Sequence, residues 1–179
     1  MDLCAACAEA PARSRIAVHR RRDGDCDGCG GAVEIWNLEF GIRNLTSGIA
    51  IVRRALEAVV AHARAEAPRE CCGLLLGRPD SVSEAVAARN IAAMATRFLV
   101  DPQDHIDTLR AARGRGLEIL GFYHSHPHTA AVPSETDRAE AGYPDHLYLI
   151  VSLAVEPADA RLFRLVMGNF REVQFVTID

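Results

Sequence analysis

Two histidines, a serine and an aspartate lie within fourteen residues of one another in the second half of the chain. His124 and His126 are separated by one residue, and Ser134 and Asp137 follow after a spacer. Alternate side chains of an extended strand point to the same side, so a strand here would aim both imidazoles at one point. A turn at Pro127 and a helix starting at Ser134 would bring Asp137 back to that point. The spacing therefore predicts one cluster of two imidazoles and one carboxylate.

Such a cluster suits hydrolysis assisted by a metal ion. Two imidazoles and a carboxylate are a usual ligand set of catalytic zinc, which leaves the fourth position to water. Zinc lowers the pKa of that water to about 7. A further group must take the proton of the water and pass it to the leaving amine. Glu70 is the best candidate, because it lies where a predicted helix gives way to a buried strand.

Simpler explanations exist for some of these residues. Ser134 and Asp137 have the spacing of a helix cap with an acidic first turn, and for Ser134 a capping role is compatible with a place at the metal. His128 follows Pro127, so no strand sets its direction, and we expect it to lie outside the ligand set. Cys72 could be a nucleophile, but a thiol in an apolar run is typical of a buried and inert residue.

The rest of the main region alternates between helical and extended patterns. Apolar residues at spacings of three and four predict a helix over residues 49–67, ended by Pro68. Asp101 followed by Pro102 predicts the start of a second helix, and Ser134 that of a third. Strands are predicted over residues 70–77, 81–91, 117–123, 147–155, 160–166 and 173–178. These patterns predict an α+β or α/β domain, a mixed sheet flanked by helices, over residues 49–179, preceded by a linker over residues 32–48.

Residues 1–31 differ in composition from the main region. Cys4 and Cys7 form one C-x-x-C pair and Cys26 and Cys29 form another, with 18 residues between the pairs. In a cytoplasmic chain this spacing favours a metal over a disulfide, and it matches a small four-cysteine zinc ribbon. Glycines surround the second pair but not the first, so a segment without fixed structure is the alternative.

Bulk composition excludes several classes of protein. The 179 residues carry a net charge of −4, which gives no overall basic signature for nucleic acid. No apolar run approaches the roughly 20 residues that a membrane helix needs. The first residues lack the basic start and long apolar run of a signal peptide. We therefore expect a cytoplasmic protein without a membrane or nucleic-acid partner, and the composition predicts no particular oligomeric state.

The stretch from Gly121 to Asp137 resembles the JAMM (MPN+) motif of zinc metallopeptidases. In that motif His-x-His-Pro is followed by a spacer and then Ser-x-x-Asp, and six residues separate Pro127 from Ser134 here. The run from Glu70 to Gly77 resembles the glutamate strand of the same family, and the resemblance extends over about residues 50–178.

The resemblance implies a fold and a set of roles. The fold would be of the MPN type, which is similar to that of cytidine deaminases. His124, His126 and Asp137 would bind one catalytic zinc, besides any structural zinc of the ribbon. Glu70 would be the general base, and Ser134 would donate a hydrogen bond to the oxyanion.

The compact domain looks like the standalone prokaryotic members of the family. That resemblance implies a ubiquitin-like or sulfur-carrier protein as substrate, cleaved after its Gly-Gly tail to release a C-terminal cysteine or a lysine-linked modifier. A general metallopeptidase, a non-catalytic scaffold of the same fold and a nucleic-acid processing protein are the alternatives. Nothing in the sequence suggests a deep side-chain pocket, so we expect an extended tail to pair with a strand edge.

Overall fold

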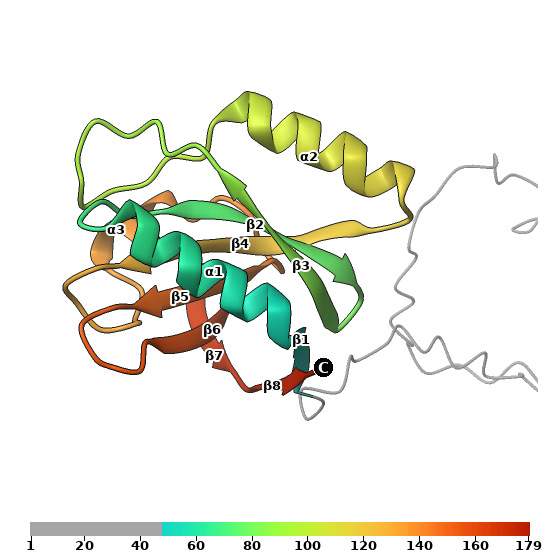
Figure 1. Ribbon diagram of the computed structural model, residues 1–179. Helices are drawn as coiled ribbons and strands as arrows, with labels where there is room; N and C mark the ends of the chain where they lie inside the picture. Colours follow the sequence, from blue (N-terminus) through green and yellow to red (C-terminus); the bar gives the residue numbers. More distant parts are fainter. Residues whose placement is uncertain (1–47) are drawn as a thin grey trace, which may run out of the picture. The chain divides into compact units, whose positions relative to one another are not determined.

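The computed structural model describes residues 48–179 (Figure 1). The predicted ribbon of Cys4, Cys7, Cys26 and Cys29 lies outside the described residues, as does the predicted linker except for its last residue.

One mixed sheet organises this region. Its strands follow the order β7-β6-β5-β4-β2-β3-β1-β8, so β4 lies near the centre between β2 and β5. The pairs β1–β3, β1–β8 and β4–β5 are parallel, and the other neighbours are antiparallel. The strands are β1 (Ile49–Val52), β2 (Cys72–Arg78), β3 (Ser81–Ala88), β4 (Glu118–His126), β5 (Leu147–Ser152), β6 (Asp159–Val166), β7 (Asn169–Val173) and β8 (Phe175–Ile178).

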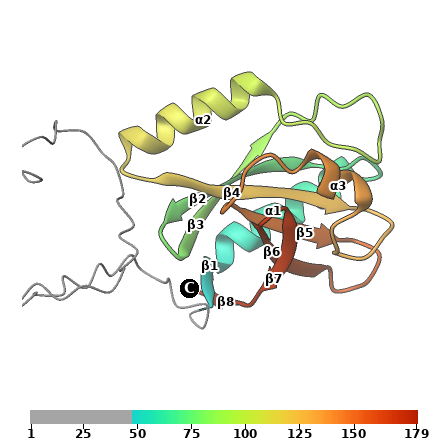
Figure 2. The same ribbon diagram turned by 180° about the vertical axis from the view of Figure 1, so that it is seen from behind.

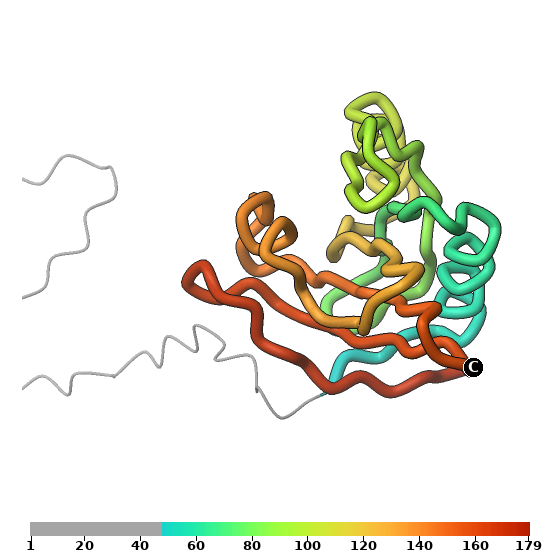
Figure 3. Tube along the Cα trace, turned by 90° about the vertical axis from the view of Figure 1, so that its left-hand side faces the viewer, coloured from blue at the N-terminus to red at the C-terminus, as the bar shows by residue number. Residues whose placement is uncertain are grey.

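Helices flank the sheet, as the sequence predicts. The helix α1 (Arg53–Glu66) packs Ala55, Val59 and Ala63 into one core cluster. The other two helices are α2 (Pro102–Gly114), which contacts β2, β3 and β4, and α3 (Glu135–Glu140). A second core cluster gathers around Phe122 and Ile150. Seen from opposite directions, α1 lies in front of the strands in one view and α3 in the other (Figures 1 and 2). The view turned by 90° shows the same separation of α1 and α3 (Figure 3). Along the part of the chain that is described, no helix is long and apolar enough to cross a membrane.

The helix predicted from residue 49 begins four residues later. Ile49 and Ile51 are both buried, and β1 pairs in parallel with β3 and β8. A strand with these two core residues at period two fits the sheet, so tertiary pairing overrides the helical pattern. The strand predicted over residues 173–178 is confirmed only as β8, and β7 before it was not predicted.

Other predicted elements are confirmed. The strand β2 is buried along its first six residues, as expected for a strand covered on both faces. The helix α2 starts at Pro102, and the Asp101 carboxylate accepts hydrogen bonds from the backbone N–H groups of Gln103 (2.7 Å) and Asp104 (3.2 Å). Both of these helix-start features were readable from Asp101-Pro102 alone.

Candidate metal centre

The last residues of β4 carry the two histidines. His124 lies opposite Cys72 of β2 and Ile150 of β5, and His126 lies opposite Ser152. Because the strand continues through both residues, their side chains share one face of the sheet. They are 2 % and 5 % exposed, so the pair is held inside the protein rather than at its surface.

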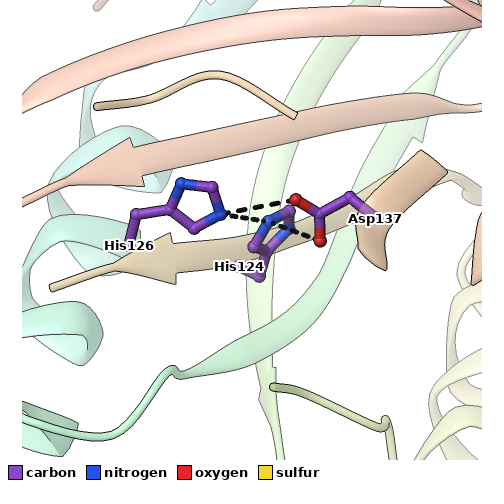
Figure 4. A group of neighbouring side chains, drawn as sticks. All are labelled: His124, His126 and Asp137. Atoms are coloured by element: carbon purple, nitrogen blue, oxygen red, sulfur yellow. Dashed lines mark hydrogen bonds and ion pairs between the residues drawn. The ribbon is translucent and has the colours of Figure 1, made fainter. Parts of the chain in front are cut away.

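Asp137 of α3 completes a convergent group (Figure 4). Its two carboxylate oxygens each lie 3.4 Å from one imidazole, at the Nε2 atoms of His124 and His126. The two Nε2 atoms are 3.1 Å apart, and one donor atom from each residue lies within 4.8 Å of the others. Atoms bonded to one tetrahedral zinc at about 2.0–2.1 Å are roughly 3.3 Å apart. The spacing of these donor atoms therefore fits a single small cation.

Hydrogen bonds behind His126 set its tautomer. Its Nδ1 atom lies 2.8 Å from the carbonyl oxygen of Ala130, so Nδ1 carries the proton and Nε2 offers a lone pair to the group. The neighbouring Thr129 carbonyl accepts a hydrogen bond from the Ser152 hydroxyl at 2.6 Å, which fixes this loop to the end of β5. The chain thus holds the ring in the orientation that a metal ligand needs.

Burial and hydrogen bonding shift the pKa values of the three side chains in different directions. Burial lowers the pKa of His124. Burial alone would raise the pKa of Asp137, but hydrogen bonds with His124 and His126 keep it well below its ordinary value. The pKa of His126 rises on balance, because its bonds to Asp137 and Ala130 outweigh its burial. An ionised carboxylate between two imidazoles is ready to bind a divalent cation.

Ser134 caps α3, as the sequence allowed. Its Oγ accepts a hydrogen bond from the Asp137 backbone N–H at 3.1 Å, and the Asp137 carboxylate accepts one from the Ser134 backbone N–H at 2.7 Å. This reciprocal capping box also aims the Asp137 carboxylate at the histidines. A hydroxyl that accepts in a cap keeps its own hydrogen to donate elsewhere. The capping role and a catalytic role for Ser134 are therefore compatible in this geometry.

Glu70 lies just before β2, beside the group. Antiparallel pairing places Cys72 opposite His124, and the Ser125 N–H donates to the Cys71 carbonyl at 3.2 Å, so the chain at Glu70 runs past the end of β4 that carries the histidines. Its side chain is 9 % exposed. Burial raises the pKa of the Glu70 carboxyl to about 7, against a lowering by His126 and with a further raising by Asp137. A buried carboxyl with a pKa near neutrality is suited to accept and release a proton.

An apolar cavity of about 330 Å³ adjoins the group, although nothing in the sequence suggests a deep side-chain pocket. His124 and Asp137 form part of its wall, and the Phe98 ring stacks on the His124 ring with 4.3 Å between centroids. No local pattern in the sequence indicates this cavity, since its walls come from segments distant in the chain. They are Phe98, Leu99, Val100, Pro102, His105, Phe122, His124, Glu140, Ala141, Gly142, Tyr143, Tyr148 and Asp137.

The remaining candidate side chains stay outside the group. Cys71 and Cys72 are free and buried, and burial raises the pKa values of their thiols to about 11 and about 12, so both are protonated at neutral pH. A protonated buried thiol is a poor nucleophile. His128 is exposed, and His62 instead bonds the Tyr123 hydroxyl at 2.9 Å.

Several known proteins are similar to this chain. A family model for prokaryotic homologues of the JAB domain matches residues 52–166. A desampylase of Haloferax volcanii is 37 % identical over 114 residues, which cover 60 % of this chain and 82 % of the relative. A CysO-cysteine peptidase of Mycobacterium tuberculosis is 32 % identical over 136 residues, or 73 % of this chain and 92 % of the relative. The solution structure of a protein from Desulfitobacterium hafniense superposes with a TM-score of 0.68 and 31 % identity, over 73 % of this chain and 92 % of that one.

Proposed function

This chain belongs to the family of prokaryotic homologues of the JAB domain, and from that premise we propose that it is a zinc-dependent peptidase acting on the Gly-Gly tail of a ubiquitin-like or sulfur-carrier protein. The observation that carries the proposal is the buried group of His124, His126 and Asp137, with the buried Glu70 carboxyl near enough to His126 and Asp137 for both to shift its pKa. The proposal is supported by relatives named desampylase and CysO-cysteine peptidase.

The residues divide the chemistry among them. His124, His126 and Asp137 hold the ion, which would supply a water of lowered pKa and polarise the scissile carbonyl. Glu70 takes the proton of the attacking water and hands it to the leaving amine, a transfer that its near-neutral pKa permits in both directions. Ser134 donates its free hydroxyl hydrogen to the oxyanion. The five residues are supplied by β4, by α3 with its N-cap Ser134, and by the chain just before β2.

Two features of the site support a Gly-Gly tail as substrate. The metal-binding group is nearly buried, so the scissile peptide must approach it closely, which glycine permits because it has no side chain. The adjoining apolar cavity can take a neighbouring side chain of an extended tail. We propose that cleavage after such a Gly-Gly tail releases either a C-terminal cysteine or a lysine-linked modifier. We also propose a cytoplasmic location, a main domain over residues 49–179, and a second, structural zinc on the four cysteines of residues 1–31.

The substrate is tested by mass spectrometry on small ubiquitin-fold proteins of the host. The C-terminal Gly-Gly of each protein carries an adduct, which is either one additional cysteine or a conjugated lysine peptide. We expect loss of the adduct in the presence of zinc-loaded protein and its persistence after chelation. If the protein cleaves unrelated peptides but cleaves none of the Gly-Gly adducts, it is a general metallopeptidase. A zinc-loaded protein that cleaves neither would be a non-catalytic scaffold.

Replacing Ser134 by alanine should separate the two roles of its hydroxyl. We expect kcat to fall by about two orders of magnitude, because one oxyanion donor is lost. Loss of the cap should also lower the free energy of unfolding by about 1 kcal/mol. Steady-state kinetics and thermal unfolding measure the two effects. Ser134→Thr, which keeps the hydroxyl, is the control and should retain most activity. An alanine variant with lower stability but unchanged kcat would limit Ser134 to capping.

A further inference from the structure

The segment between β3 and α2 forms a loop beside the metal-binding group. Residues 90–100 are closed at their base, where Asn90 pairs with Val100 and the Ile91 N–H donates to the Leu99 carbonyl at 2.9 Å. We call this segment the 90–100 loop. It belongs to no regular helix or strand, so side-chain bonds add to these backbone bonds in setting its shape.

The Asn90 side chain supplies those bonds. Its Oδ1 accepts from the backbone N–H groups of Ala92 and Leu99, each at 3.0 Å. Its Nδ2 donates to the Arg97 carbonyl at 2.9 Å and to the Glu70 carbonyl at 2.8 Å. An asparagine amide has two N–H donors and one oxygen with two acceptor positions, so all of its capacity is used. Three of the four bonds shape the loop, and the fourth reaches Glu70.

The 90–100 loop forms hydrogen bonds with both backbone polar groups of Glu70. Its N–H donates to the Ala95 carbonyl at 2.9 Å, and its carbonyl accepts from Asn90. The β2–β4 ladder begins only at Cys72, so neighbouring strands do not hold the peptide groups of Glu70. The position of its carboxylate therefore depends on the 90–100 loop.

The same loop contacts both elements that carry the metal-binding group. Phe98 stacks on His124 with an angle of 20° between the rings. The Arg97 guanidinium forms an ion pair with Glu140 of α3, the helix that supplies Asp137. One loop thus touches the general base, the histidine strand and the aspartate helix.

We propose that Asn90 is a positioning residue, which sets the place of the Glu70 carboxylate relative to the metal-binding group by fixing the 90–100 loop to the Glu70 backbone. The inference rests on the proposed function, in which Glu70 carries the proton. A displacement of about 1 Å in a reacting group can cost roughly 100-fold in rate. A role of this kind acts on turnover and leaves substrate binding and metal affinity unchanged.

The test is Asn90→Asp, which keeps the shape and the acceptor oxygen of the side chain but removes both donated hydrogen bonds. We expect kcat for the Gly-Gly adduct to fall by about 10- to 100-fold, with KM and zinc content unchanged. In a Glu70→Gln background the same substitution should have no further effect on kcat, because the base that it positions is already gone. Asn169→Asp is the matched control. Its amide donates to the Met167 carbonyl in the turn between β6 and β7, and its kcat should equal that of the wild type.

Hydrogen exchange gives a readout that does not depend on the substrate. The Glu70 amide should exchange faster in Asn90→Asp, while β4 and β5 keep their protection. If the wild type cleaves no Gly-Gly adduct, the proposed function fails, and the exchange result alone still decides whether Asn90 holds Glu70. Unchanged exchange at Glu70, a change in KM alone, or an additive loss in the Glu70→Gln background would overturn the proposal. A variant that does not fold would lose zinc and protection in β4 together, and Asn90→Ser would then take its place.

Discussion

Replacing Glu70 by glutamine should remove nearly all turnover and leave the metal-binding group intact. Glutamine has the same shape but cannot accept and release a proton at neutral pH, so the loss should reach about two to four orders of magnitude in kcat. Glu70 is not one of the three converging ligands, so zinc content should not change. Because burial disfavours its ionised form, we expect no loss of thermal stability.

Kinetics, elemental analysis and thermal unfolding of Glu70→Gln check these three expectations together. Glu66→Gln is the matched control, since Glu66 is exposed and lies four residues earlier at the end of α1. It should behave as the wild type in all three measurements. If Glu70→Gln keeps more than about a tenth of the wild-type kcat, then another group carries the proton.

Replacing His126 by alanine should have the largest effect of all, because it removes a ligand. The His126 Nε2 atom is one of three converging donor atoms, and its loss leaves only one imidazole and one carboxylate. Removal of a residue behind a ligand typically costs 10- to 100-fold in metal affinity, so loss of the ligand itself should cost more than about 100-fold. Activity should fall to background with it.

Elemental analysis and competition with a chelator measure this loss. We expect one zinc fewer per chain than in the wild type, whatever number the wild type binds. His128→Ala is the matched control, because His128 is an exposed imidazole two residues away. It should bind zinc as the wild type does. Undiminished zinc affinity in His126→Ala would remove His126 from the ligand set.

Part of this site was predictable because its signals are local. In a strand, the spacing of His124 and His126 places both side chains on the same face of the sheet. The spacing of Ser134 and Asp137 indicates the start of a helix. These signals depend on residues a few positions apart, and the structure brings the three side chains together as expected. The Asp101-Pro102 helix start was predictable for the same reason.

Other features depend on pairing between distant segments, which short-range patterns do not encode. The place of Glu70 follows from hydrogen bonds of its backbone to Asn90 and Ala95 of the 90–100 loop. The apolar residues of β1 also fit a helical repeat, and only pairing with β3 and β8 decides for a strand. The 90–100 loop and the apolar cavity likewise form only when the sheet and the helices have packed.

The most direct test of a catalytic metal in this chain is anomalous X-ray diffraction above and below the zinc K edge, on crystals of protein purified without chelator. We expect an anomalous peak in contact with the Nε2 atoms of His124 and His126 and with the carboxylate of Asp137. A zinc-loaded protein with no peak at these three residues, or a peak there that Asp137 does not contact, would contradict the ligand set on which the proposed hydrolysis depends.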